Sequence, residues 1–274
     1  MHTPTGTRVW YAARALLGAL LVAAIVRQLA ASVGTAQELS RDVGVTIANF
    51  FSFFTILSNT AAAIVLLWAA VWFFTRARPA SSSTSPRRTD STDSTDSTDS
   101  TDSTDSSEPV GLAVALASVS TYMIVTGIVY NLLLRQVELP QGSEPVWWSN
   151  EVLHLVGPLF LLADVMFGPL RRALPWRALG AIVAFPIVWV IYTMIRGLLV
   201  TNPTNGEAFW YPYPFLNPNN LALVPIAGYP GVILYVIGIA VAILAVGTFV
   251  VWWGRRSRRA PGEEDAPVEA SAAH

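Results

Sequence analysis

The sequence predicts an all-α, polytopic membrane protein whose six transmembrane helices form one bundle. Of its 274 residues, 53% are hydrophobic and 13% are charged, whereas a soluble domain carries about 25% charged residues. A helix needs roughly 20 apolar residues to cross a hydrocarbon core, and six stretches meet that length: 9–31, 50–74, 110–134, 148–168, 176–199 and 229–253. A chain in lipid must satisfy its backbone internally, so we expect these stretches to be helices. Cysteine is absent, which excludes disulfides and thiol chemistry.

The first stretch, 9–31, has a second interpretation. Arg8 and Arg14 precede an apolar run and small residues follow it, as in a cleavable signal peptide. The run is longer than the apolar region of about 7–15 residues in such peptides. Trp10 and Tyr11 are also typical of an anchor at the membrane interface. We therefore expect a retained transmembrane helix.

A low-complexity segment separates the second and third stretches. Residues 79–109 include six consecutive Thr-Asp-Ser triplets, from Thr89 to Ser106. They offer no apolar surface to bury and carry repeated negative charge, so they should be disordered. The predicted organisation is helices 1 and 2 in 1–78, the disordered linker in 79–109, helices 3 to 6 in 110–259 and a disordered tail in 260–274, with all spans in one domain.

The loop between the fifth and sixth stretches differs from the other linkers. Its Trp-Tyr-Pro-Tyr-Pro-Phe run has too many rings and prolines for a flexible linker. We expect residues 201–228 to fold against the rim of the bundle as a cap. Trp210, Tyr211 and Tyr213 are predicted to act as interfacial anchors, with no chemical role.

Arginine positions predict the orientation. All seventeen Lys and Arg residues are Arg, a bias found in GC-rich bacterial genomes. Cytoplasmic loops carry the excess of basic residues. With the N-terminus inside, thirteen Arg residues lie at inner span ends and four at outer ones: Arg27, Arg41, Arg135 and Arg196. The sequence thus predicts a multi-pass protein of the bacterial plasma membrane with both termini in the cytoplasm.

An ionisable side chain within a span is costly in lipid, by about 2.5–3.5 kcal/mol at least, and is a candidate for function. His154 is the one histidine within a span, six residues below the outer edge of the fourth stretch, or about 9 Å deep. Thr55 and Asn59 of the second stretch share a helical face at the matching depth. Such polar residues often only join helices. His154 favours chemistry instead, because it can act as the base for the Thr55 hydroxyl.

Several polar residues are expected to support this pair. Glu151, three residues before His154, would accept from the second ring nitrogen and orient the imidazole. Asn59, Asn131 or Arg196 would stabilise an oxyanion, although Arg196 could instead extend to the interface. Asp164 is expected to pair with a neighbouring helix. The Glu151-x-x-His154 pattern has no second copy, so we predict no metal site.

Five strings of the sequence are together similar to a known family. They are Phe-Phe-Ser-Phe-Phe-Thr-Ile-Leu-Ser-Asn at 50–59, Val-Tyr-Asn-Leu-Leu-Leu-Arg at 129–135, Asn-Glu-Val-Leu-His at 150–154, Tyr-Thr-Met-Ile-Arg-Gly at 192–197 and Tyr-Pro-Tyr-Pro-Phe-Leu at 211–216. Their order resembles that of the bacterial Pr-six-Pr membrane proteins, which resemble the androgen-induced-protein and androgen-dependent-regulator family of animals. The resemblance implies an intramembrane hydrolase that cleaves fatty-acid esters of hydroxy fatty acids. It places the Thr nucleophile at Thr55 and the His base at His154.

Two functions follow as expectations. The first is hydrolysis of long-chain fatty-acid esters by Thr55 and His154, without a cofactor. The alternative is a non-catalytic lipid-binding or carrier protein that holds an acyl carboxylate between Arg196 and His154. In both, the partner is a membrane lipid or fatty-acid ester and not nucleic acid. The sequence leaves the oligomeric state open.

Overall fold

The computed structural model describes residues 5–76, 107–140, 142–220 and 226–256, and within them the chain is helical with no strand. Six helical segments are long and apolar enough to cross a membrane, which confirms the predicted fold class. They are α1 (Thr5–Glu38), α3 (Phe54–Arg76), α4 (Val110–Val129) with the π-helix η1 (Tyr130–Leu134), α5 (Trp147–Glu151) with the π-helix η2 (Val152–Val156) and α6 (Gly157–Phe167), α7 (Ala178–Gly197), and α8 (Tyr229–Arg256). The predicted disordered tail, and the predicted linker up to residue 106, lie outside the described residues.

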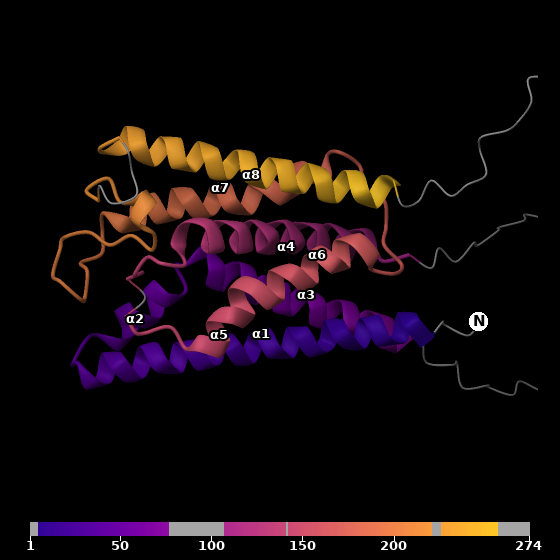
Figure 1. Ribbon diagram of the computed structural model, residues 1–274, viewed down its shortest axis with the longest axis horizontal. Helices are drawn as coiled ribbons and strands as arrows, with labels where there is room; N and C mark the ends of the chain where they lie inside the picture. The colour runs from indigo at the N-terminus through magenta and orange to yellow at the C-terminus, as the bar shows by residue number, and fades with distance from the viewer. Residues whose placement is uncertain (1–4, 77–106, 141, 221–225, 257–274) are drawn as a thin grey trace, which may run out of the picture.

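The helices run side by side along the long axis of the molecule (Figure 1). α1 begins and α8 ends at the same end of the bundle, which we call the basic end; the opposite end is the cap end. α4 is the central helix, in contact with α3, α6, α7 and α8. In its most apolar window 67% of the residues are buried, against 17% in α7 and in α8. α7 and α8 are therefore the least buried of the six segments.

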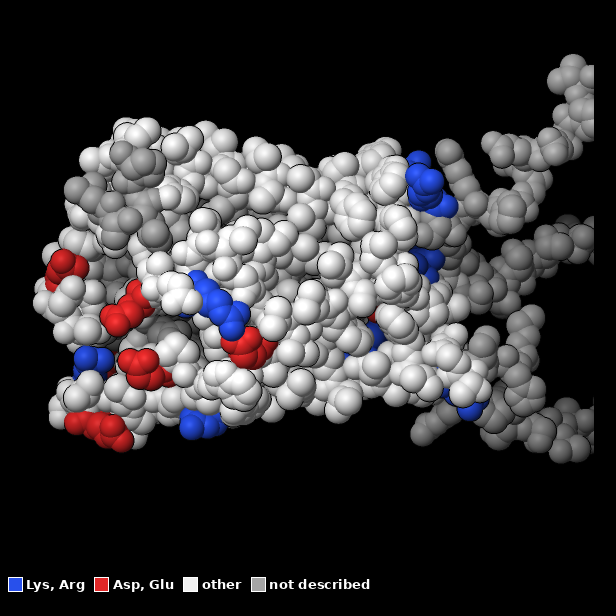
Figure 2. Space-filling model, in the orientation of Figure 1, with Lys and Arg blue, Asp and Glu red and all other residues white. Residues whose placement is uncertain are grey.

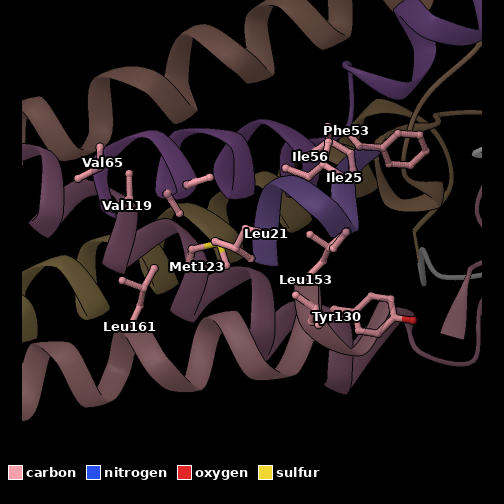
Figure 3. Close-up of a cluster of buried hydrophobic side chains, with 14 of the residues drawn as sticks. Leu21, Ile25, Phe53, Ile56, Val65, Val119, Met123, Tyr130, Leu153 and Leu161 are labelled. Carbon is pink, nitrogen blue, oxygen red and sulfur yellow. The ribbon is translucent and has the colours of Figure 1, made fainter. Parts of the chain in front are cut away.

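α1 is an integral part of the bundle. Its 34 residues extend about 51 Å, which exceeds the hydrocarbon thickness of about 30 Å. It packs along α3, and Leu21 of α1 points into a core that also contains Met123 of α4 and Leu161 of α6 (Figure 3). All three side chains are completely buried. A segment packed in this way is a transmembrane helix of the fold.

The predicted second span begins differently from the expected 50–74. A separate short helix, α2 (Val43–Phe50), comes first, and the Asp42 side chain caps it by accepting from the Val45 N–H at 2.8 Å. The chain then leaves helical geometry for three residues, and α3 starts at Phe54. Thr55 consequently lies in the first turn of α3, where backbone N–H groups have no partner within the helix.

A buried ion cluster closes the bundle near the basic end. Arg14 is completely buried; it donates to both carboxylate oxygens of Asp164, at 2.8 and 3.0 Å, and to Glu108 at 2.6 Å. The Tyr11 hydroxyl also donates to Glu108, at 2.7 Å. The expected pairing of Asp164 with another helix is confirmed. Arg14, counted above among the thirteen Arg residues near the inner span ends, compensates these two buried carboxylates.

We expect Arg14→Met to be strongly destabilising, since it removes the cation that is hydrogen-bonded to the buried carboxylates of Glu108 and Asp164. Removal of one partner from a buried ion pair costs about 3–5 kcal/mol. The measurement is the free energy of unfolding in mixed detergent micelles. Arg177→Met, at an exposed position at the start of α7, should change that free energy by no more than about 0.5 kcal/mol. If Arg14→Met and Arg177→Met lowered the free energy of unfolding by the same amount, that result would contradict a specific role for the ion cluster.

Candidate active site

Thr55 contacts a tyrosine from the cap segment (201–220). The Tyr213 hydroxyl accepts from the Thr55 backbone N–H at 3.2 Å and lies 3.2 Å from Thr55 Oγ1. Burial raises the pKa of Tyr213 above its ordinary value, and its contacts with Thr55 lower it by less. The phenol is therefore neutral near pH 7 and keeps its proton available for donation. It lies at the positive N-terminal end of α3.

The cap segment is ordered and buried against the bundle, as predicted. Trp210 donates its backbone N–H to the Gly197 carbonyl at 2.9 Å. Gly197 allows this approach, since a Cβ there would overlap the Tyr211 ring. Trp210, Tyr211 and Tyr213 are all buried. Their prediction as interfacial anchors was therefore wrong, and Tyr213 was missed as a site residue because aromatic rings in a loop carry no signal for a contact with a distant helix.

His154 lies in the π-helix η2, beside the π-helix η1 at the end of α4. Its ring stacks on the Tyr130 ring with 3.6 Å between centroids. Its Nδ1 lies 3.0 Å from the Asn150 carbonyl. A carbonyl only accepts, so Nδ1 carries the proton and the neutral ring has its lone pair on Nε2. That is the tautomer of a general base. Short π-helical segments often occur at functional sites.

Pro158 explains why two asparagines contact this segment. Because proline has no N–H, it cannot donate to the Leu153 carbonyl, as in a π turn, or to the His154 carbonyl, as in an α turn. Asn59 Nδ2 donates to the Leu153 carbonyl at 3.3 Å, and Asn131 Nδ2 donates to the His154 carbonyl at 3.0 Å. Each amide also donates to a carbonyl of its own helix. The expectation that Asn59 or Asn131 stabilises an oxyanion is therefore replaced by a role in holding η2.

Glu151 does not orient His154. Its carboxylate accepts from Arg135 at 2.6 Å, and Arg135 also donates to Asn131 at 2.6 Å. The expected contact between Glu151 and the imidazole was wrong, because Nδ1 is already bonded to the backbone carbonyl one turn earlier. Glu151 and Arg135 instead join α5 to the end of η1 at the cap end.

Arg196 lies away from the His154 ring. It donates to the buried Asn49 side chain of α2 at 2.7 Å, and its guanidinium lies 5.3 Å from the centre of the Trp210 ring. It is not among the residues that line a cavity with Thr55 or His154. The expected oxyanion or carboxylate contact is replaced by a structural one between α2, α7 and the cap segment.

Thr55 lies where two cavities meet. The polar cavity, of about 870 Å³, is at the cap end and is lined by Thr55, Tyr130 and His154 together with charged residues that include Arg135. The apolar cavity, of about 270 Å³, extends between α4, α7 and α8 and is lined by Thr55, Tyr130 and Tyr213 at the cap end. No direct hydrogen bond joins Thr55 to His154, so a substrate or water in the polar cavity would have to lie between them.

Within the described ranges, no group of three or more His, Asp or Glu side chains is placed to hold a metal ion. No protein-family model, curated protein or solved structure matches this chain.

Proposed function

We propose that this membrane protein hydrolyses long-chain fatty-acid esters, with Thr55 as the nucleophile and His154 as the general base. The observation that carries the proposal is the position of Thr55 at the junction of the apolar and polar cavities. An ester makes the same demand: its acyl chain is apolar, whereas its carbonyl carbon must be reached by water. A site of this kind places the bond to be broken between lipid and water.

The reaction proceeds in two steps. The Thr55 hydroxyl attacks the carbonyl carbon and loses its proton, through a water in the polar cavity, to His154 Nε2; the tetrahedral intermediate then expels the alcohol, which receives that proton from His154. Water next attacks the acyl-Thr55 ester, again losing a proton to His154. Collapse releases the fatty acid and returns the proton to Thr55. Each step conserves protons and needs no cofactor.

The oxyanion needs donors that are in place before the reaction. Asn59 and Asn131 are already engaged with backbone carbonyls. The Thr55 backbone N–H already donates to the Tyr213 hydroxyl, so the remaining candidate is the neutral Tyr213 hydroxyl, 3.2 Å from Thr55 Oγ1. The positive end of the α3 dipole favours negative charge at the same point.

We also propose that the protein is related to the Pr-six-Pr family. The strings around Thr55 and His154 are those that resemble the Pr-six-Pr proteins, and this resemblance specifies fatty-acid esters of hydroxy fatty acids as the substrate. We also propose a bacterial plasma membrane with the basic end in the cytoplasm. Acidic side chains gather at the cap end of the face in Figure 2, and basic ones predominate at the opposite end. Cytoplasmic ends carry the excess of Arg.

Purified protein reconstituted in vesicles should release free fatty acid from a hexadecanoyl ester, with first-order dependence on protein concentration. A lipid carrier would bind the ester and release no acid, and that result would contradict the proposal. No observed contact favours the carrier over the hydrolase, because Arg196 contacts Asn49 and Trp210 and lines neither cavity.

A further inference from the structure

The residues that line the apolar cavity extend along the bundle. Its lining begins at Thr55 and Tyr213 and continues along α8 from Val236 to Leu244, a rise of about 12 Å for eight residues. Below the cap end its walls are aliphatic and aromatic side chains, and the Thr126 hydroxyl there is paired with Ser58 at 3.4 Å. Among the residues that the structure describes, no charged side chain lines it.

This cavity opens toward the membrane between α7 and α8. Ile187 of α7 and Leu244 of α8 both line it, yet 52% and 46% of their surfaces are exposed. Ala240 of α8, one helical turn before Leu244, also lines the cavity and is also exposed. α7 carries Pro186 in its interior at this level, which removes one backbone hydrogen bond from the helix wall. In a bilayer, exposed side chains at this depth on α7 and α8 contact hydrocarbon.

We propose that the apolar cavity is an acyl-chain binding site that fills laterally from the bilayer through the opening between α7 and α8, and that its depth selects the acyl-chain length of the ester. The inference about chain-length selection rests on the proposed hydrolase function, because it is measured as a ratio of ester hydrolysis rates. Lipid tails are as apolar as leucine side chains, so a chain moves from the bilayer into this cavity without crossing water. Void space in a packed protein forfeits dispersion contacts, and an acyl chain restores them.

The chain offers a matched pair of variants on α8. Ala240→Phe fills the cavity part-way along its length. Gly238→Phe adds the same ring two residues earlier, on the opposite side of the helix, where a Cβ meets nothing within 4 Å. The measured quantity is the ratio of the rate for a hexadecanoyl ester to that for a butanoyl ester. We expect Ala240→Phe to lower this ratio at least about tenfold and Gly238→Phe to leave it within about twofold of wild type.

A binding measurement separates this proposal from the hydrolase itself. Wild-type protein in vesicles is exposed to a hexadecanoic acid that carries a diazirine near its methyl end, irradiated and digested for peptide mapping. Adducts at Ile187, Ala240 or Leu244, reduced in Ala240→Phe, support the acyl site even if no ester is hydrolysed. Adducts spread evenly over the lipid-facing residues of all helices would overturn it. An unchanged chain-length ratio in Ala240→Phe, with wild-type hydrolysis intact, would also overturn it.

Discussion

Thr55→Val should reduce ester hydrolysis by at least about 10³-fold, because valine keeps the shape of threonine and removes the attacking oxygen. Without the nucleophile, the remaining rate enhancement comes only from substrate binding and oxyanion stabilisation. The measurement is kcat/KM for a long-chain ester in vesicles. Thr55→Ser, which keeps a hydroxyl at the same position, should retain hydrolysis.

Thr60→Val is the matched control on the same helix. Its hydroxyl donates to the Ile56 carbonyl at 2.7 Å and lines neither cavity. This variant should hydrolyse the ester at close to the wild-type rate. If Thr55→Val is as active as Thr60→Val, Thr55 is not the nucleophile.

His154→Ala should lower kcat by about 10²–10⁴-fold, which is the usual contribution of a positioned general base. The substitution leaves a space beside Tyr130 that opens to the polar cavity. Added imidazole should therefore restore part of the activity in this variant and none in Thr55→Val. The rate is measured as a function of imidazole concentration.

A purely structural role for His154 predicts a different pattern. The variant would then unfold at lower denaturant concentration than wild type, and imidazole would give no recovery. Unfolding in mixed micelles, measured on the same preparation, distinguishes a missing base from a damaged fold.

The spans could be predicted from the sequence because hydropathy and length are properties of contiguous residues. Counting along two helices predicts that Thr55 and His154 lie at one depth, and both line the polar cavity; their action as a catalytic pair stays a prediction. The start of α3 could not be predicted, because nothing in the apolar run 50–74 signals the break that puts Thr55 at a helix N-terminus. Asp42, which caps α2, is the one local signal for a helix that starts before that run.

The contacts of the supporting residues depend on tertiary structure. Glu151 was assigned to His154 because it lies three residues before it, but Arg135 reaches its carboxylate from another helix. Tyr213 reaches Thr55 from 158 residues away, which no spacing rule predicts. Pro158 was a usable signal: a proline four residues after His154 frees a backbone carbonyl, and a polar donor nearby should have been expected.

The most direct test of Thr55 as an activated nucleophile is to locate a covalent adduct. Wild-type protein in vesicles is treated with a long-chain fluorophosphonate, digested and mapped by mass spectrometry. We expect a single stoichiometric adduct on Thr55, suppressed by prior addition of a hexadecanoyl ester and lost in Thr55→Val. An adduct on Ser52 or Ser58 instead, or complete loss of ester hydrolysis in protein whose Thr55 remains unmodified, would contradict it.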